Sequence, residues 1–404
     1  MCTSIFTKTK DGKHFLARTM DFSFPLEGNP VFLPRDYSWH VLDGKEMTNK
    51  YAMLGTGRGI AGNYIFTDGI NEHGLAIAEL YLPGEAVYNK KDVKGKNNLA
   101  PWEFLNWTLG NYKSINNLEK DLKNIRLIDK ELPILNKSIP LHFILADLTG
   151  HVVVIEPSGG ELKFKENPAG VMTNTPDLEW HTQNLRNYIH IQPRQFSSKK
   201  YGEFTATPFS QGTGTTGLPG GFTPSQRFVR AAFFKEYINE ARDEEEGVTN
   251  IWQILNTVRI PKGVVIEDSE GEDYTQYLAA MCLETKSFYF TSYENNQITR
   301  AELTDELIEN GDIVIFEVPR NQLYYTPKGK VAQENAFTTV REVIELLDDI
   351  KTTKKGQIEG KNKHLLKKID DKFLNENISN IKDFLDIIEK NKDQLKQFEK
   401  NKGK

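Results

Sequence analysis

The second residue of the chain is a cysteine, and this position gives it two reactive groups. Methionine aminopeptidases remove an initiator methionine that precedes a small residue, so loss of Met1 would leave Cys2 with a thiol and a free α-amino group. Such amines have pKa values of about 7.7–8.0 and are usable general bases near neutral pH. Cys2 is therefore predicted to supply both nucleophile and base. The alternative is a small buried residue behind the initiator.

The N-terminal segment is predicted to bring a carboxylate to this cysteine. Residues 3–9 and 13–22 alternate in the manner of two strands, and the Asp11-Gly12 dipeptide between them is a strong hairpin signal. A turn centred on that dipeptide sets Asp21 directly opposite Cys2.

Arg18 is the second candidate partner of Cys2, and it lies three residues before Asp21. Strict alternation sends the two side chains to opposite faces of the sheet, so both are expected to reach Cys2 only if the strand bulges or twists near Thr19 and Met20. The alternative for Arg18 and Asp21 is an ordinary ion pair at a strand end, which contributes little.

The elements that must position these residues follow an α+β pattern with largely antiparallel sheets. Further strands are expected at residues 74–82, 141–148, 152–156, 277–284 and 313–318. Helices are expected at residues 101–109, 115–125 after a Ser114 cap, 227–241 and 249–258. The Gly/Pro/Ser/Thr-rich stretch 192–225 is expected to be a long loop at the rim of a site or in a subunit contact.

The composition changes near Leu346, after which lysine is frequent and arginine and proline do not occur. Ile381, Leu385 and Ile388 have helical spacing on a charged background. We therefore expect one domain over residues 1–345 and a Lys-rich helical appendage of unknown role over residues 346–404.

Composition excludes several classes of function. The net charge of -5 gives no overall basic field for nucleic acid or an anionic membrane. The first twenty residues are too charged for a signal peptide, and no stretch approaches the roughly 18 apolar residues of a membrane span, so a cytoplasmic location is expected. Cys2 and Cys282 are the only cysteines, and the histidines lack ligand spacing, so neither metal nor cofactor is expected.

An ordered series of motifs extends from the N-terminus to about residue 320. The motifs are CTS (2–4), ARTMDF (17–22), NEHGL (71–75), GVMTN (170–174), EWH (179–181), NLR (184–186), LPG (218–220), FTPS (222–225) and IPKGV (260–264). In this series the chain resembles the choloylglycine hydrolase family. These are N-terminal-nucleophile enzymes that include penicillin V acylases and conjugated bile salt hydrolases.

The resemblance implies a catalytic set. Its members are Cys2, Arg18, Asp21, Tyr81, Asn174 and Arg227. Cys2 would be the nucleophile, and Arg18 would hold its sulfur as the thiolate, as a nearby cation does in general. Asp21 would orient the α-amino group.

The remaining members would act on the substrate carbonyl. The side-chain amide of Asn174 and the backbone N–H of Tyr81 would form an oxyanion hole. Arg227 would reach back toward Asp21 and the reacting centre. Without the family context, Asn174 is a turn residue and Arg227 a charge on a helix surface. His181 accompanies the motifs and is interpreted as structural.

The same resemblance implies a four-layer αββα sandwich, a homotetramer, and hydrolysis of a non-peptide amide bond through a thioester. Tyr81 favours penicillin V as the substrate, because penicillin V acylases commonly carry tyrosine at this position and bile salt hydrolases asparagine. An aromatic ring there would narrow the cavity and suit a flat aryl group. Conjugated bile salts are the alternative substrate, and N-acyl homoserine lactones a third.

Two rival functions remain at this stage. Glutamine amidotransferases also begin with Met-Cys, but they usually continue with Gly-Ile, whereas Thr3 and Ser4 follow here. The other rival is an inactive domain whose basic tail binds an acidic partner, which retention of Met1 would support.

Overall fold

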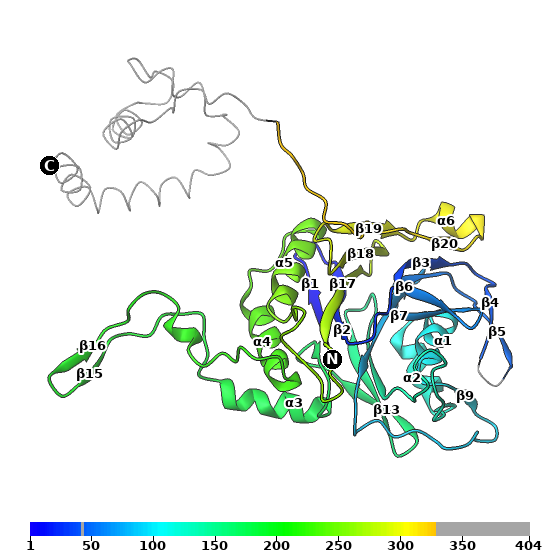
Figure 1. Ribbon diagram of the computed structural model, residues 1–404, viewed down its shortest axis with the longest axis horizontal. Coiled ribbons are helices and arrows are strands. Elements are labelled where there is room, and N and C mark those ends of the chain that lie inside the picture. Colours follow the sequence, from blue (N-terminus) through cyan, green and yellow to red (C-terminus); the bar gives the residue numbers. More distant parts are fainter. Residues whose placement is uncertain (42–43, 329–404) are drawn as a thin grey trace. The chain divides into compact units, whose positions relative to one another are not determined.

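The computed structural model describes residues 1–41 and 44–328. Two large antiparallel sheets pack face to face between two groups of helices, and Figure 1 shows the four layers. The predicted α+β class and αββα architecture are therefore confirmed. Within the described residues, no helix is long and apolar enough to cross a membrane.

The first sheet has six strands and contains the N-terminus. In spatial order they are β14 (Val171–Met172), β1 (Cys2–Lys8), β2 (His14–Phe22), β17 (Tyr274–Cys282), β18 (Ser287–Ser292) and β19 (Thr299–Glu302). β2 lies between β1 and β17, and residues 15–21 are buried on both faces. Charged residues are rare in a buried central strand, so Arg18 and Asp21 are exceptional in this segment.

The second sheet has eight strands. They are β13 (Glu161–Glu166), β12 (Val152–Ser158), β11 (Leu141–Ala146), β8 (Ala76–Tyr81), β7 (Asn63–Asn71), β6 (Met53–Ile60), β3 (Asn29–Leu33) and β20 (Val314–Ile315). Three strand pairs lie outside the two sheets. They are β9 (Asn97–Leu99) with β10 (Ile125–Leu127), β4 (Ser38–His40) with β5 (Glu46–Thr48), and β15 (Lys199–Tyr201) with β16 (Phe204–Ala206).

The helices cover the outer faces of the sheets. α4 (Pro224–Tyr237) and α5 (Glu244–Asn256) pack on the six-stranded sheet, and α1 (Glu103–Asn111) packs on β7 and β8 of the other sheet, with α2 (Ile115–Leu122) following it in the same apolar core. The short helical segments are α3 (Leu178–Asn184), α6 (Asp305–Asn310), η1 (Leu185–Tyr188) and η2 (Thr213–Thr215). Ser114 caps α2 as predicted, by accepting a hydrogen bond from the backbone of Asn117.

Several predicted bounds were wrong. The helix expected at residues 249–258 begins at Glu244, because Asp243 caps it by accepting from the backbone N–H of Glu246. The helix expected at 115–125 ends at Leu122, and only two residues of the strand expected at 313–318 pair with β3.

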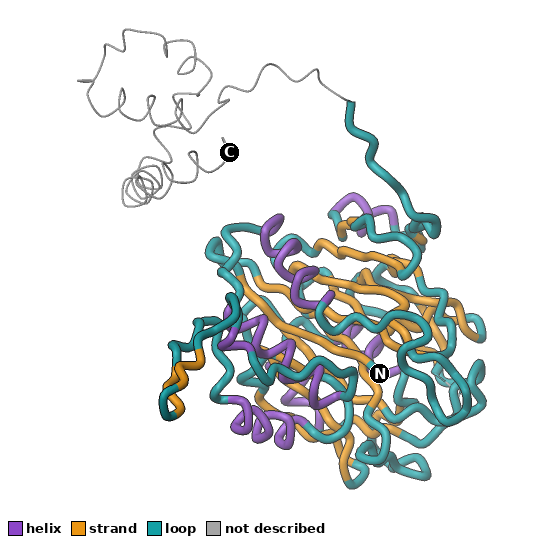
Figure 2. The backbone as a smooth tube through the Cα atoms, turned by 60° about the vertical axis from the view of Figure 1, so that its left-hand side comes forward, coloured by secondary structure: helices purple, strands orange, loops and turns teal. Residues whose placement is uncertain are grey.

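The segment 192–225 is not a plain loop. It contains the β15–β16 hairpin, which extends away from the layers in Figure 1 and again in Figure 2. Residue contacts divide the chain after Tyr324. The expected boundary at residue 345 and the helical appendage lie outside the described residues.

Candidate active site

The β1–β2 hairpin sets Cys2 opposite Met20, so the predicted pairing of Cys2 with Asp21 was wrong by one residue. The loop comprises residues 10–12 and is closed by a backbone hydrogen bond of 2.9 Å between its flanking residues. Gly12 ends the loop in the left-handed region with φ +85°. A three-residue loop of this kind is a common alternative to the two-residue turn, and it moves every pair of the ladder by one position.

The observed register divides the site between the two faces of β2. The side chains of Arg18 and Met20 lie on the same face as the Cys2 sulfur, and those of Thr19 and Asp21 lie on the opposite face. Arg18 therefore reaches the sulfur by simple alternation.

The bulge that the sequence required near Thr19 and Met20 does not occur in the β1–β2 ladder, which is continuous over all seven residues of β1. A register shift lies instead in the neighbouring strand β17, between Thr275 and Tyr277. It brings Thr275 beside Asp21 and Tyr277 beside Met20.

A buried charge network surrounds the sulfur. Nη2 of Arg18 lies 2.9 Å from Sγ of Cys2, and Nη1 donates to the carboxylate of Asp68 at 3.2 Å. The Tyr277 hydroxyl donates to the same Asp68 oxygen at 2.6 Å. Burial opposes the charge of Arg18, but the surrounding Tyr277, Cys2 and Asp68 raise its pKa above the ordinary value. A buried guanidinium cation therefore lies against the sulfur.

Asp21 is held on the other face of β2. Its carboxylate accepts hydrogen bonds from Oγ1 of Thr19 at 3.0 Å and from Oγ1 of Thr275 at 2.5 Å. With Met1 still attached, the terminal amine donates to the main-chain oxygen of Asp21 at 2.5 Å. Asp21 thus lies beside the chain terminus, while its role in orienting a Cys2 amine stays a prediction.

Asn174 joins three other parts of the site. Its Oδ1 accepts from the backbone N–H of Cys2 at 2.8 Å and from Nη2 of Arg227 at 2.6 Å, and its Nδ2 donates to the carbonyl oxygen of Tyr81 at 2.7 Å. Arg227 also donates to the Cys2 carbonyl oxygen at 2.5 Å. Arg227 is fully buried, which lowers its pKa, while Asp21 and Cys2 act against that shift. The structure thus brings together the predicted Tyr81, Asn174 and Arg227.

Two histidines hold the backbone at Asn174. Nε2 of His142 lies 3.0 Å from the carbonyl oxygen of Thr173, and Nε2 of His181 lies 2.8 Å from that of Asn174. The His181 ring stacks on Phe228 of α4 with centroids 4.8 Å apart. These contacts agree with a structural role for His181 and extend that role to the position of Asn174.

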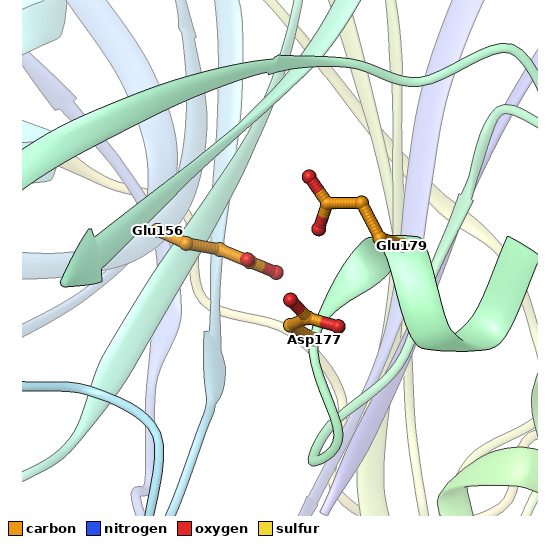
Figure 3. Close-up of side chains that lie close together, drawn as sticks. All are labelled: Glu156, Asp177 and Glu179. Carbon is orange, nitrogen blue, oxygen red and sulfur yellow. The ribbon is translucent and has the colours of Figure 1, made fainter.

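A cluster of three carboxylates anchors the start of α3. Glu156, Asp177 and Glu179 converge in Figure 3 with a spacing that a metal ion could use. The ammonium group of Lys165 forms ion pairs with all three, at 2.5 Å from Glu156 and 3.3 Å from Asp177. Lys165 therefore supplies the cation of this cluster and ties β12 and β13 to the helix that follows Asn174.

Cys2 lines an apolar pocket with about 760 Å³ of empty space, its open mouth included. Other lining residues are Met20, Phe22, Ile65, Tyr81, Leu135 and Ile139. The Tyr81 ring packs edge-on against Phe22, with centroids 6.2 Å apart. The site thus places the Cys2 sulfur, in contact with Arg18, at the wall of a cavity for an apolar group.

Comparison with known proteins identifies the family. Residues 2–316 match the sequence profile of the linear amide C–N hydrolases, choloylglycine hydrolase family. The chain belongs to this family. A bile salt hydrolase/transferase from Clostridium perfringens is 36% identical over 321 residues, which cover 78% of this chain and 97% of that protein. The conjugated bile acid hydrolase of Lactobacillus gasseri is 28% identical, with 78% and 100% covered.

Two penicillin V acylases match this chain at lower identity. The acylase of Pectobacterium atrosepticum is 23% identical, with 68% of this chain and 73% of that protein covered. Among solved structures, the C2A mutant of the C. perfringens conjugated bile acid hydrolase is 34% identical with a TM-score of 0.76, covering 81% and 100%. The acylase of Agrobacterium tumefaciens is 22% identical with a TM-score of 0.61, covering 77% and 90%, and so shares the fold.

As a member of the choloylglycine hydrolase family, the chain is a hydrolase of linear amide bonds. The sequence did not single out Asp68 and Tyr277, which hold Arg18, or His142, which holds the Asn174 loop. For Asp68 a signal was present, because a charged residue in the otherwise uncharged stretch 63–71 needs a buried partner.

Proposed function

We propose that the chain hydrolyses conjugated bile salts and releases the glycine or taurine from the steroid acid. The observation that carries the proposal is the Cys2 sulfur beside the buried Arg18, at the wall of an apolar pocket. The relatives named for bile salts are matched at higher identity and over almost their whole lengths. Penicillin V, which the sequence favoured through Tyr81, becomes the second candidate. The Tyr81 ring packs against Phe22 at the pocket wall and suits an apolar acyl group of either kind.

In the proposed mechanism, removal of Met1 gives Cys2 a free amine. The Cys2 amine takes the thiol proton, and the sulfur, beside the Arg18 cation, attacks the amide carbon and forms a C–S bond. The oxygen of the tetrahedral intermediate takes the negative charge, and the second N–H of the Asn174 amide and the backbone N–H of Tyr81 donate to it. One N–H of the Asn174 side chain donates to the Tyr81 carbonyl oxygen. This bond fixes the orientation of the amide group and leaves its second N–H for the substrate.

The intermediate then loses the amine. The Cys2 amino group, acting as general acid, protonates the leaving nitrogen, so the C–N bond breaks and a thioester remains. In the second half, the same amine takes a proton from water, and the water oxygen attacks the thioester carbon. The C–S bond then breaks, the acid leaves, and the amine returns the proton to the sulfur. Asn174 Oδ1 and Arg227 fix the position of the nitrogen and of the adjoining carbonyl group.

The deciding experiment compares kcat/KM for glycocholate and penicillin V on one preparation that lacks Met1, with an N-acyl homoserine lactone as a third substrate. Glycocholate should be cleaved faster than penicillin V, and Cys2→Ala is the control for background hydrolysis. A clear preference for penicillin V would restore the acylase function, and cleavage of none of the three would reject all of these substrates.

The location and the oligomeric state of the enzyme are part of the same proposal. Removal of an initiator methionine takes place in the cytoplasm, which supports a cytoplasmic location. The β15–β16 hairpin exposes Tyr201 and Phe204 to solvent, and the segment after it exposes Phe209. Apolar side chains in such a position favour contact with another copy of the chain. We therefore propose a homotetramer. Light scattering should give a tetramer for the wild type and smaller species for the double variant Phe204→Ser/Phe209→Ser. A wild type that is a monomer would reject the proposed tetramer.

A further inference from the structure

The apolar pocket beside Cys2 contains two polar atoms that lack partners. Oε2 of Glu79 and Oγ1 of Thr56 are buried and have no hydrogen-bond partner among the described residues, and both side chains line the pocket. Glu79 is 7% exposed and Thr56 2% exposed. Buried polar atoms are almost always hydrogen-bonded in folded proteins, so two exceptions in one cavity need an explanation.

The two residues come from neighbouring parts of the eight-stranded sheet. Glu79 is in β8, two residues before Tyr81 and therefore on the same face of that strand, and Thr56 is in β6. Strand β7 lies between β8 and β6. The register sets Thr56 opposite Asp68 and Asp68 opposite Ala78, so Thr56 and Glu79 lie on opposite faces of the sheet. Both residues nevertheless line the pocket, at two separate positions.

The chemistry of the two groups limits what they can bind. Burial raises the pKa of Glu79 well above its usual range; Arg18 opposes this shift and Asp68 adds to it. Burial thus favours the protonated carboxyl group, which can donate one hydrogen bond and accept others, and a threonine hydroxyl can do both as well. A hydroxyl group is a matching ligand, because it can accept a hydrogen bond from either side chain and donate one to it.

We propose that Glu79 and Thr56 are two hydrogen-bonding positions of one acyl subsite, each of which binds a hydroxyl group on the acyl part of the substrate, so that hydroxylated apolar acyl groups are preferred. This rests on the proposed function, because conjugated bile salts are apolar steroid acids that differ in their ring hydroxyls. The subsite acts on substrate choice and not on the chemical step.

A second role for Glu79 must be separated from this one. Glu79 lies near Arg18 and could act only through the charge that faces the sulfur. Its loss would then change the turnover of every substrate by the same factor. A hydroxyl subsite instead changes the ratio between substrates that differ in hydroxyl groups.

The test measures kcat/KM for glycocholate, which is rich in ring hydroxyls, and for glycolithocholate, which is poor in them. Glu79→Leu should lower the glycocholate-to-glycolithocholate ratio by about tenfold, the effect of losing about one good hydrogen bond. Glu79→Gln keeps a donor and an acceptor and should retain most of the ratio. An unchanged ratio in Glu79→Leu would overturn the subsite.

Thr56 allows a matched control. Oγ1 of Thr108 is also buried without a partner among the described residues, but Thr108 does not line the pocket. Thr56→Val should lower the ratio and Thr108→Val should leave it unchanged. Equal effects of the two substitutions would reject a role for Thr56.

Failure of the proposed function would be recognised separately. If the wild type cleaves neither conjugate, bile salt hydrolysis is wrong. The subsite is then tested by calorimetry, which measures the binding of cholate and lithocholate to Cys2→Ala and to the double variant Cys2→Ala/Glu79→Leu. A tighter binding of cholate that Glu79→Leu abolishes supports the subsite. Equal binding of the two acids, or a preference that Glu79→Leu leaves intact, rejects it.

Discussion

Nε2 of His181 lies 2.8 Å from the carbonyl oxygen of Asn174, in a buried position where the imidazole ring also stacks on Phe228. Because a carbonyl oxygen only accepts, Nε2 must carry the proton, and Nδ1 is left without a partner among the described residues. The neutral ring thus fixes the backbone of the residue whose side chain contacts Cys2 and Tyr81.

We expect His181→Phe to lower kcat by up to about tenfold with little change in KM. Phenylalanine keeps the stack on Phe228 but cannot hold the Asn174 carbonyl group. Steady-state kinetics with one amide substrate measures the effect. His73→Phe is the matched control, because His73 also accompanies the motifs but packs edge-on against Tyr51. An equal loss of kcat in the two variants would show that His181 has no special role in holding Asn174.

Stability should depend on pH through the same ring. Burial lowers the pKa of His181 in the folded chain, so the unfolded chain binds more protons once the pH falls below about 6.5. The wild type should therefore lose stability as the pH falls through that region, and His181→Phe should lose less. Thermal melts between about pH 7.5 and 5.5 test this. Parallel curves for the two proteins would mean that His181 does not titrate on unfolding.

Cys2 is expected to be the N-terminal residue of the active protein, because the mechanism needs its free amine. Mass spectrometry should find Met1 removed. Cys2→Ser and Cys2→Ala should stay folded and lose nearly all hydrolysis. Wild-type turnover by either variant would show that another group is the nucleophile, and an active protein that retains Met1 would show that the amine is not needed.

Asn174→Ala should lower kcat by about 10²–10³, which is the usual effect of losing one oxyanion donor. Asn187→Ala, at an exposed position after α3, is the control for amide loss in this region and should have wild-type kinetics. A change in KM alone would mean that Asn174 positions the substrate without stabilising the transition state.

Ending the chain after residue 345 should leave amidase activity intact. The family match ends at residue 316, and the contacts of the first unit end at Tyr324. Activity and melting temperature of the shortened and complete chains make the comparison. A shortened chain that unfolds or loses turnover would make residues 346–404 part of the folded enzyme.

The sequence predicted the class of the fold but not its register. Short runs of strand-forming residues bounded by turn signals predicted strands such as β1 and β2, and the layer order came from the family resemblance. The register depends on whether the loop has two or three residues, and Asp11-Gly12 fits both, so Asp21 was set opposite Cys2 in place of Met20.

The proposed catalytic residues could be singled out because they lie in motifs, and the structure brings them close together, whereas their supports could not be predicted. Asp68 and Tyr277 both contact Arg18, and the hydrogen bond between them joins residues that are 209 positions apart in the chain. No local pattern encodes such a contact. The substrate was harder still, because a single ring at Tyr81 does not describe a pocket built from several segments.

The sulfur and the main-chain nitrogen of Cys2 contact different neighbours, and this separation has a consequence for evolution. The sulfur contacts Arg18, which depends on Asp68, whereas the main-chain nitrogen contacts Asn174, which depends on Arg227 and His181. In the proposed mechanism, selection can therefore adjust the nucleophilicity of the thiol and the basicity of the amine one at a time. A single residue with both proposed tasks would keep in this way an independence that enzymes with a separate histidine base obtain from having two residues.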